Sequence, residues 1–143
     1  MTLEDLPPWA RDLIIATPVA RLGFLDHSDR PRVLPVTFAV FDGALWSAID
    51  RKPKRSAEPA RVRRLRRRPQ AALLVDAYHD DWTRLAWVEL RGLVSVLDVS
   101  EAGKALAALA SKYEQYRAEP PPGPLLRLAP EAFACWRASE ASG

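Results

Sequence analysis

The chain is 143 residues long and 48% hydrophobic, which suits one folded domain spanning residues 1–143 and excludes a disordered chain. Its single cysteine, Cys135, excludes an intrachain disulfide, and no apolar run approaches the roughly 20 residues that span a bilayer, so we expect a cytoplasmic protein without a membrane partner. The net charge of +3 hides an uneven distribution, because residues 51–68 carry +9 and the rest of the chain carries −6.

The first fifty residues predict one helix followed by three strands. Pro7-Pro8 can open the helix, and Thr17-Pro18 ends it. Asp42-Gly43 predicts a hairpin, because a type I′ turn needs a positive φ at both central positions. Pro35 removes a ladder hydrogen-bond donor, so its strand is expected at a sheet edge or in a bulge. The three strands are expected over residues 19–26, 32–41 and 44–50.

The remaining residues predict two more helices and the strands that complete the sheet. The first helix, over residues 59–68, has only Val62 and Leu65 as an apolar stripe and is therefore mostly solvated. The second, over residues 102–117, has Asp98 or Ser100 as its candidate cap. A bend or bulge is expected at Gly92. The strands are expected over residues 71–78, 82–97, 125–128 and 133–137.

This order of elements predicts a mainly β (α+β) fold with two to three peripheral helices. The strands, six or seven in number, are joined mainly by hairpins, and no βαβ alternation repeats, which argues against a parallel sheet. Antiparallel strands in this number usually close into a barrel, which removes exposed edges. We therefore expect an antiparallel barrel.

No motif in the sequence indicates a catalytic triad or a metal centre. A glycine-rich phosphate loop, HExxH and GxSxG are all missing, and two histidines with one cysteine support no zinc site. The acids Asp80-Asp81 are expected to be solvated, and Cys135 is expected to be a small buried hydrophobic residue. Most tryptophans are expected in the core, and Trp82 is the best candidate for an exposed ligand contact. We predict no catalytic side chain and no metal ligand.

The basic stretch divides into two parts. Lys52, Lys54 and Arg55 follow a strand directly and are well placed to bind a phosphate, whereas Arg61–Arg68 lies on a helix and is expected to be a charged outer face. Nucleic acid is an alternative partner, since small barrels bind single strands through basic grooves and stacked aromatic residues, with an affinity that falls with salt. The net acidic remainder of the chain and the expected burial of Trp46 make nucleic acid the less favoured partner.

Three segments together resemble the pyridoxamine 5′-phosphate oxidase-like split-barrel superfamily. Within it, the chain resembles the flavin/deazaflavin oxidoreductases that use coenzyme F420, over residues 9–139. The most specific parts are D-x-K-P-K-R at Asp50–Arg55 and D-D-W-T-R-L-x-W-V at Asp80–Val88. Ser56–Pro59 departs from the relatives, which often continue basic there. The segments are VARLGFLDHSDRPRVLPVTFAVFDGALWSAIDRKPKR, PQAALLVDAYHDDWTRLAWVELRG and LASKYEQYRAEPPPGPLLRLAPEAFACWRAS.

The resemblance implies a split β-barrel homodimer that acts on a small-molecule substrate, with two equivalent cofactor sites at the subunit interface. A flavin or deazaflavin carries the hydride chemistry itself, so no catalytic side chain is required. A basic patch that continues to Arg68 fits the acidic tail of F420 better than the single phosphate of FMN, and FMN is the alternative. The implied contacts are the ring with Leu34, Pro35, Val36, Thr37, Ser47 and Ala48, the phosphate with Lys52, Lys54 and Arg55, and the rest of the pocket with Trp82, Arg84 and Trp87 of either subunit.

Overall fold

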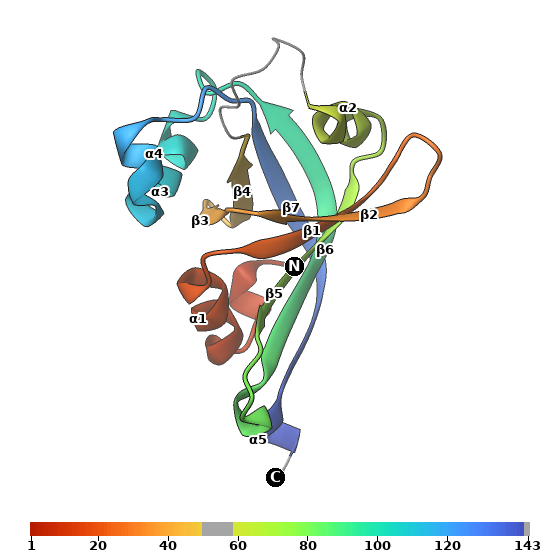
Figure 1. Ribbon diagram of the computed structural model, residues 1–143, viewed down its shortest axis with the longest axis vertical. Helices are drawn as coiled ribbons and strands as arrows, with labels where there is room; N and C mark the ends of the chain where they lie inside the picture. The colour runs from red at the N-terminus through yellow and green to blue at the C-terminus, as the bar shows by residue number, and fades with distance from the viewer. Residues whose placement is uncertain (50–58, 142–143) are drawn as a thin grey trace.

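The computed structural model describes residues 1–49 and 59–141 as one antiparallel sheet with helices around it (Figure 1). The strands are β1 Ala20–Leu25, β2 Pro31–Val36, β3 Ala39–Phe41, β4 Ala44–Ala48, β5 Gln70–Ala77, β6 Ala86–Leu97 and β7 Leu125–Arg137. The helices are α1 Pro8–Ala16, α2 Ala60–Arg67, α3 Gly103–Lys112, α4 Glu114–Ala118 and α5 Ala138–Ala141, with 3-10 turns η1 Leu3–Asp5 and η2 Trp82–Arg84.

The sheet has seven strands in the order β2-β1-β5-β6-β7-β4-β3. Its two outermost strands, β2 and β3, are joined by only Thr37 and Phe38, so the two ends of the sheet meet and the sheet curves round on itself. Every strand pair is antiparallel. The predicted antiparallel, mainly β fold with peripheral helices is confirmed.

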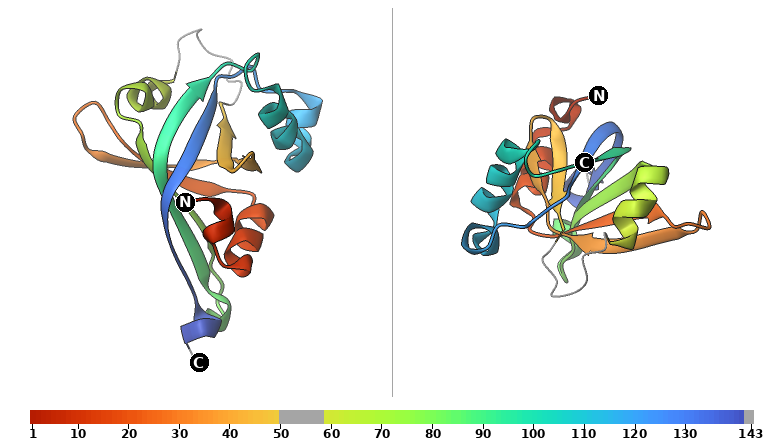
Figure 2. Two further views of the ribbon diagram at one scale, coloured as in Figure 1. Left: turned by 180° about the vertical axis from the view of Figure 1, so that it is seen from behind. Right: turned by 90° about the horizontal axis from the view of Figure 1, so that it is seen from above.

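Two clusters of buried side chains hold the helices to the sheet. In the larger cluster, Ile14 of α1 and Leu65 of α2 pack with Leu90 of β6, all within 1% of full burial. In the smaller one, Leu109 of α3 packs with Trp46 of β4. Figure 2 shows α3 and α4 beside the β3–β4 hairpin, at a distance from α2. Within the described residues, no helix has the length and apolar character to cross a membrane.

Three local predictions are confirmed. Asp42 and Gly43 have φ values of 52° and 72°, as the hairpin turn requires. Pro35 lies in β2, which is an edge strand of the sheet. The pairing of β6 with β7 shifts register between Arg91 and Gly92, which is the bulge expected there.

One predicted strand is interrupted, one begins later than predicted, and two others are joined. The strand expected over residues 32–41 stops at Val36 and resumes at Ala39, so it contributes to both edges of the sheet. The strand expected from Trp82 begins at Ala86, because the Asp81 carboxylate accepts hydrogen bonds from the Thr83 amide and hydroxyl and stabilises a 3-10 turn. The two strands expected at residues 125–128 and 133–137 form the single strand β7.

The helix predicted over residues 102–117 is divided at Tyr113, where the backbone is extended. Neither Asp98 nor Ser100 caps its start: the N-cap is Ala102, which has no side-chain cap, and the Glu101 carboxylate accepts instead from the Asp98 amide. The break turns α4 to pack beside α3. It also places two tyrosine hydroxyls against the segment that joins β2 to β3.

Candidate functional site

The junction between β2 and β3 brings together two of the segments expected to contact the cofactor ring. The Ser47 hydroxyl of β4 donates a hydrogen bond of 2.7 Å to the Thr37 carbonyl. The Thr37 hydroxyl in turn lies 2.6 Å from the hydroxyl of Tyr116 in α4. Residues 34–37 and 47–48 therefore meet at one end of the barrel.

The side chains at this junction differ in their exposure. Pro35 is exposed, and Leu34 and Thr37 are half-buried, so these side chains can meet a ligand at the surface. The side chains of Val36, Ser47 and Ala48 are less than one-tenth exposed, and Ser47 is already bonded to Thr37. A ring placed here would contact the first three through side chains and the others mainly through their backbone.

Tyr113 fixes the same junction from the helix break, and the sequence reasoning missed this role. Its hydroxyl accepts a 2.9 Å hydrogen bond from the Phe38 amide. It can donate to the carbonyl of Phe38 at 2.8 Å or of Pro18 at 2.7 Å. Burial raises the pKa of the Tyr113 phenol, so the donor form is kept. The only sequence signal was two tyrosines three residues apart, which fitted equally well as part of a helical apolar stripe.

Lys112 places a titratable cation beside this junction. Its ammonium lies 3.7 Å from the centroid of the Phe38 ring and 5.5 Å from that of Tyr113. Partial burial lowers its pKa to about 8, while contact with the aromatic face favours the charged form. The Lys112 amine therefore lies against the Phe38 ring and, with its pKa of about 8, can take up or release a proton near that pH.

The three residues expected to bind the cofactor phosphate, Lys52, Lys54 and Arg55, lie outside the described residues. Their stretch begins directly after β4, at whose end Ser47 and Ala48 lie. The described chain resumes at Pro59, just before α2. The strand that precedes the basic stretch in the sequence is therefore the strand bonded to Thr37.

Trp82, Arg84 and Trp87 lie at the other end of the molecule. Turn η2 packs against α5, and the Ala138 amide donates to the Leu85 carbonyl at 2.9 Å (Figure 1). Trp82 is 70% exposed, as expected for a ligand contact, and Trp87 is 37% exposed. One chain does not bring these three side chains to the Thr37–Ser47 junction.

The remaining candidates are placed as follows. Val62 and Leu65 are fully buried and anchor α2, so its arginines lie mainly on the outer side, as expected. Cys135 is half-buried and packs against the larger core cluster. Across residues 1–49 and 59–141, no group of three or more His, Cys, Asp or Glu side chains could hold a metal ion.

The sequence matches the family model described as pyridoxamine 5′-phosphate oxidase over residues 6–137. The chain belongs to the pyridoxamine 5′-phosphate oxidase family. This is a family of flavin-related oxidoreductases, and the split-barrel fold expected from the sequence is the fold of its members. A comparison with curated proteins finds no match.

Solved structures with the same fold have diverse names. A conserved hypothetical protein from Mycobacterium tuberculosis has a TM-score of 0.77 at 16% identity, covering 100% of this chain and 89% of the other. An FAD-binding protein from Mesorhizobium loti has a TM-score of 0.68 at 16% identity, covering 91% and 94%. A haem storage protein from Vibrio cholerae has a TM-score of 0.71 at 16% identity, covering 96% and 95%. At these identities the likeness shows the fold alone.

Proposed function

We propose that this protein is a cytoplasmic, homodimeric oxidoreductase that transfers a hydride between coenzyme F420 and a small organic substrate. The observation that carries the proposal is the hydrogen-bonded junction of Thr37 with Ser47 in β4, the strand after which the basic stretch follows in the sequence. A cofactor whose ring lies at the junction and whose phosphate binds Lys52, Lys54 and Arg55 would use both the junction and the basic stretch. FMN would use them too and is the alternative.

The proposed hydride transfer requires no catalytic side chain. When bound, a deazaflavin or flavin supplies the hydride transfer. The chain's own residues then bind and orient the ring: Leu34, Pro35 and Thr37 offer contact surface, while the Tyr116 hydroxyl bonds the Thr37 hydroxyl and the Tyr113 hydroxyl bonds the Phe38 amide. Lys112, over the ring of Phe38, would influence the charge at this end of the barrel.

Haem, which one structural neighbour stores, is less well supported. Histidine is a common axial ligand of haem iron. In this chain His27 lies in the β1–β2 turn and His79 lies after β5, and both are exposed. Neither lies in a segment of the Thr37–Ser47 junction.

A second copy of the chain completes the proposed site. A shallow hollow of about 580 Å³ crosses the outer face of the sheet, where Val33 is 64% and Leu93 is 43% exposed. Arg32, Arg91 and Glu131 line the same hollow, so the surface holds both signs of charge and can pair with itself about a two-fold axis. Such a dimer would let Trp82 or Trp87 of one subunit contribute to a site on the other.

Replacing Lys52 and Lys54 of the basic stretch tests the cofactor site. We expect K52A/K54A to weaken F420 binding at least about 100-fold, because each charge-assisted contact to a phosphate contributes about 1.5–3 kcal/mol. The measurement is a titration followed by F420 fluorescence, with FMN titrated in parallel. Lys104→Ala, which removes one exposed charge from α3, is the control and should change the affinity less than about twofold.

The outcomes separate the alternatives. Micromolar binding of FMN but not F420 would show that FMN is the cofactor. Unchanged binding of both cofactors by K52A/K54A, or micromolar binding of neither by the wild type, would refute the proposed cofactor site.

Charging the hollow tests the dimer. We expect the wild type to sediment at twice the chain mass of 16.0 kDa and V33E/L93E to sediment as a monomer, because two buried carboxylates per subunit would face each other. Ile15→Glu changes an equally exposed residue of α1, outside the hollow, and should stay dimeric. A monomeric wild type, or a V33E/L93E variant that remains dimeric, would contradict the interface.

A further inference from the structure

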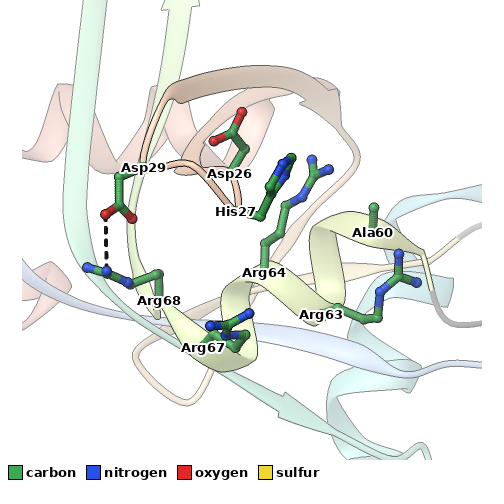
Figure 3. A pocket seen from close by; sticks show the side chains of 8 residues that line it. All are labelled: Asp26, His27, Asp29, Ala60, Arg63, Arg64, Arg67 and Arg68. Atoms are coloured by element: carbon green, nitrogen blue, oxygen red, sulfur yellow. Dashed lines mark hydrogen bonds and ion pairs between the residues drawn. The ribbon is translucent and has the colours of Figure 1, made fainter.

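A cationic hollow, distinct from the one on the outer face of the sheet, lies between α2 and the turn that joins β1 to β2. Its volume is about 310 Å³. Arg64 reaches from α2 toward His27 in the turn, and Arg68 is paired with Asp29 (Figure 3). None of the residues around it belongs to the segments proposed to contact the cofactor ring or phosphate, although the resemblance to F420-dependent proteins would extend the acidic tail of F420 along the same basic stretch, toward Arg68. It is lined by Asp26, His27, Asp29, Ala60, Arg63, Arg64, Arg67 and Arg68.

The two acids of this hollow are already engaged. Asp29 pairs with Arg68 at 3.1 Å. The Asp26 carboxylate accepts from the amides of Ser28 at 2.8 Å and Arg30 at 2.9 Å, and the Arg30 bond most strongly lowers its pKa. Asp26 is therefore charged and shapes the turn. Among the described residues, no carboxylate lies within ion-pairing distance of Arg64 or Arg67.

The arginines are held close together by the helix itself. Arg63 and Arg67 are four residues apart, and Arg64 and Arg67 are three apart, so their side chains are neighbours on the helix surface. Like charges at these spacings destabilise a helix, and the sequence of α2 itself contains no acidic residue. Val62 and Leu65, both fully buried, fix the helix and hence the cluster. A bound anion would relieve this repulsion.

We propose that this hollow is a binding site for a polyphosphate group, such as pyrophosphate or the phosphates of a nucleotide, separate from the proposed cofactor site. Each guanidinium can donate two parallel hydrogen bonds to a phosphate, and a phosphate chain presents several negative charges within the reach of Arg63, Arg64 and Arg67. A single carboxylate brings only one charge to the same cluster. The volume lies at the lower end for small-molecule sites, which fits a phosphate chain.

The test is calorimetric titration with sodium pyrophosphate at physiological salt. We expect the wild type to bind one pyrophosphate per chain, Arg67→Gln to bind at least about tenfold more weakly and R64Q/R67Q at least about 100-fold more weakly. Arg66→Gln is the matched control: it removes one charge from the same helix at a residue outside the hollow. It should weaken binding less than about threefold, through long-range attraction only.

Further arms of the experiment identify other sources of binding. K52A/K54A should bind pyrophosphate as the wild type does, so loss of F420 binding by that variant leaves this site intact. Pyrophosphate binding that disappears in K52A/K54A and persists in R64Q/R67Q would overturn the proposal. So would no binding by the wild type, or tighter binding of a tri-γ-glutamate peptide or an oligothymidylate at the same arginines, since these outcomes would assign the hollow to a cofactor tail or to nucleic acid.

Discussion

Gly92→Ala is expected to lower the free energy of unfolding by more than about 3 kcal/mol. A Cβ at this position would lie 2.0 Å from the carbonyl oxygen of Ala129 and 2.9 Å from its carbon. Both are backbone atoms of the neighbouring strand β7, so no side-chain rotation can make room, and the strands must separate at the bulge. Urea unfolding followed by circular dichroism measures the loss, and a variant that does not fold at all would agree with it.

Gly103→Ala is the matched control for this effect. Gly103 begins α3, and a Cβ built there meets no atom within 4 Å. The free energy of unfolding should stay the same or rise by up to about 1 kcal/mol, because alanine lowers the conformational entropy of the unfolded chain relative to glycine. An unfolding midpoint for Gly92→Ala equal to that of Gly103→Ala would show that β6 and β7 can separate at little cost, contrary to the packing described.

The bulge at Gly92 was predictable because it rests on a local signal, a glycine in an otherwise regular strand. The same holds for the Asp42-Gly43 turn, whose positive φ values depend on those two residues. The turn at Trp82–Arg84 also has a local cause, the Asp81 side chain bonded to Thr83, but the apolar alternation beyond it suggested a longer strand. Sequence reasoning succeeds where neighbouring residues decide the backbone and no competing periodicity runs across them.

The break at Tyr113 could not be predicted in this way. The periodicity of apolar residues runs through it, and what stabilises the break is hydrogen bonding to Pro18 and Phe38, which lie 95 and 75 residues away in the chain. Two further hydrogen bonds join Thr37 to Tyr116, 79 residues away, and to Ser47, 10 residues away. Resemblance to the family therefore named the segments of the proposed site, whereas the hydrogen bonds of Tyr113, Tyr116 and Ser47, which together form a clamp on Thr37 and Phe38, follow only from the tertiary structure.

The proposed site and the fold share this clamp. Thr37 and Phe38 join the two edges of the sheet, so whatever fixes them both closes the barrel and positions the surface offered to a ring. Tyr113 is outside every segment that the resemblance assigned to the cofactor. A positioning role for it predicts a change in stability and in cofactor binding together.

Tyr113→Phe is expected to lower the free energy of unfolding by about 2–3 kcal/mol. The hydroxyl accepts from the Phe38 amide and donates to the carbonyl of Pro18 or Phe38, so its loss leaves that amide and one carbonyl without a bond, next to a Phe38 side chain that is 1% exposed. The variant should also lack one cause of the wild type's loss of stability above about pH 10. In the wild type the raised pKa keeps folded Tyr113 protonated while the unfolded phenol ionises, which favours the unfolded state. Phenylalanine has no proton to lose, so this contribution is missing from the variant.

Tyr78→Phe makes the same chemical change at a side chain that is 74% exposed, and it should alter stability by less than about 0.5 kcal/mol. Thermal unfolding at neutral pH and at pH 10–11 compares the two variants. If the proposed function holds, F420 affinity measured well below the unfolding temperature falls for Tyr113→Phe and not for Tyr78→Phe, because only the first loosens the backbone of Phe38, next to Thr37. Equal stability of the two variants would show that the Phe38 amide finds another partner, and the clamp would then have no part in holding the site.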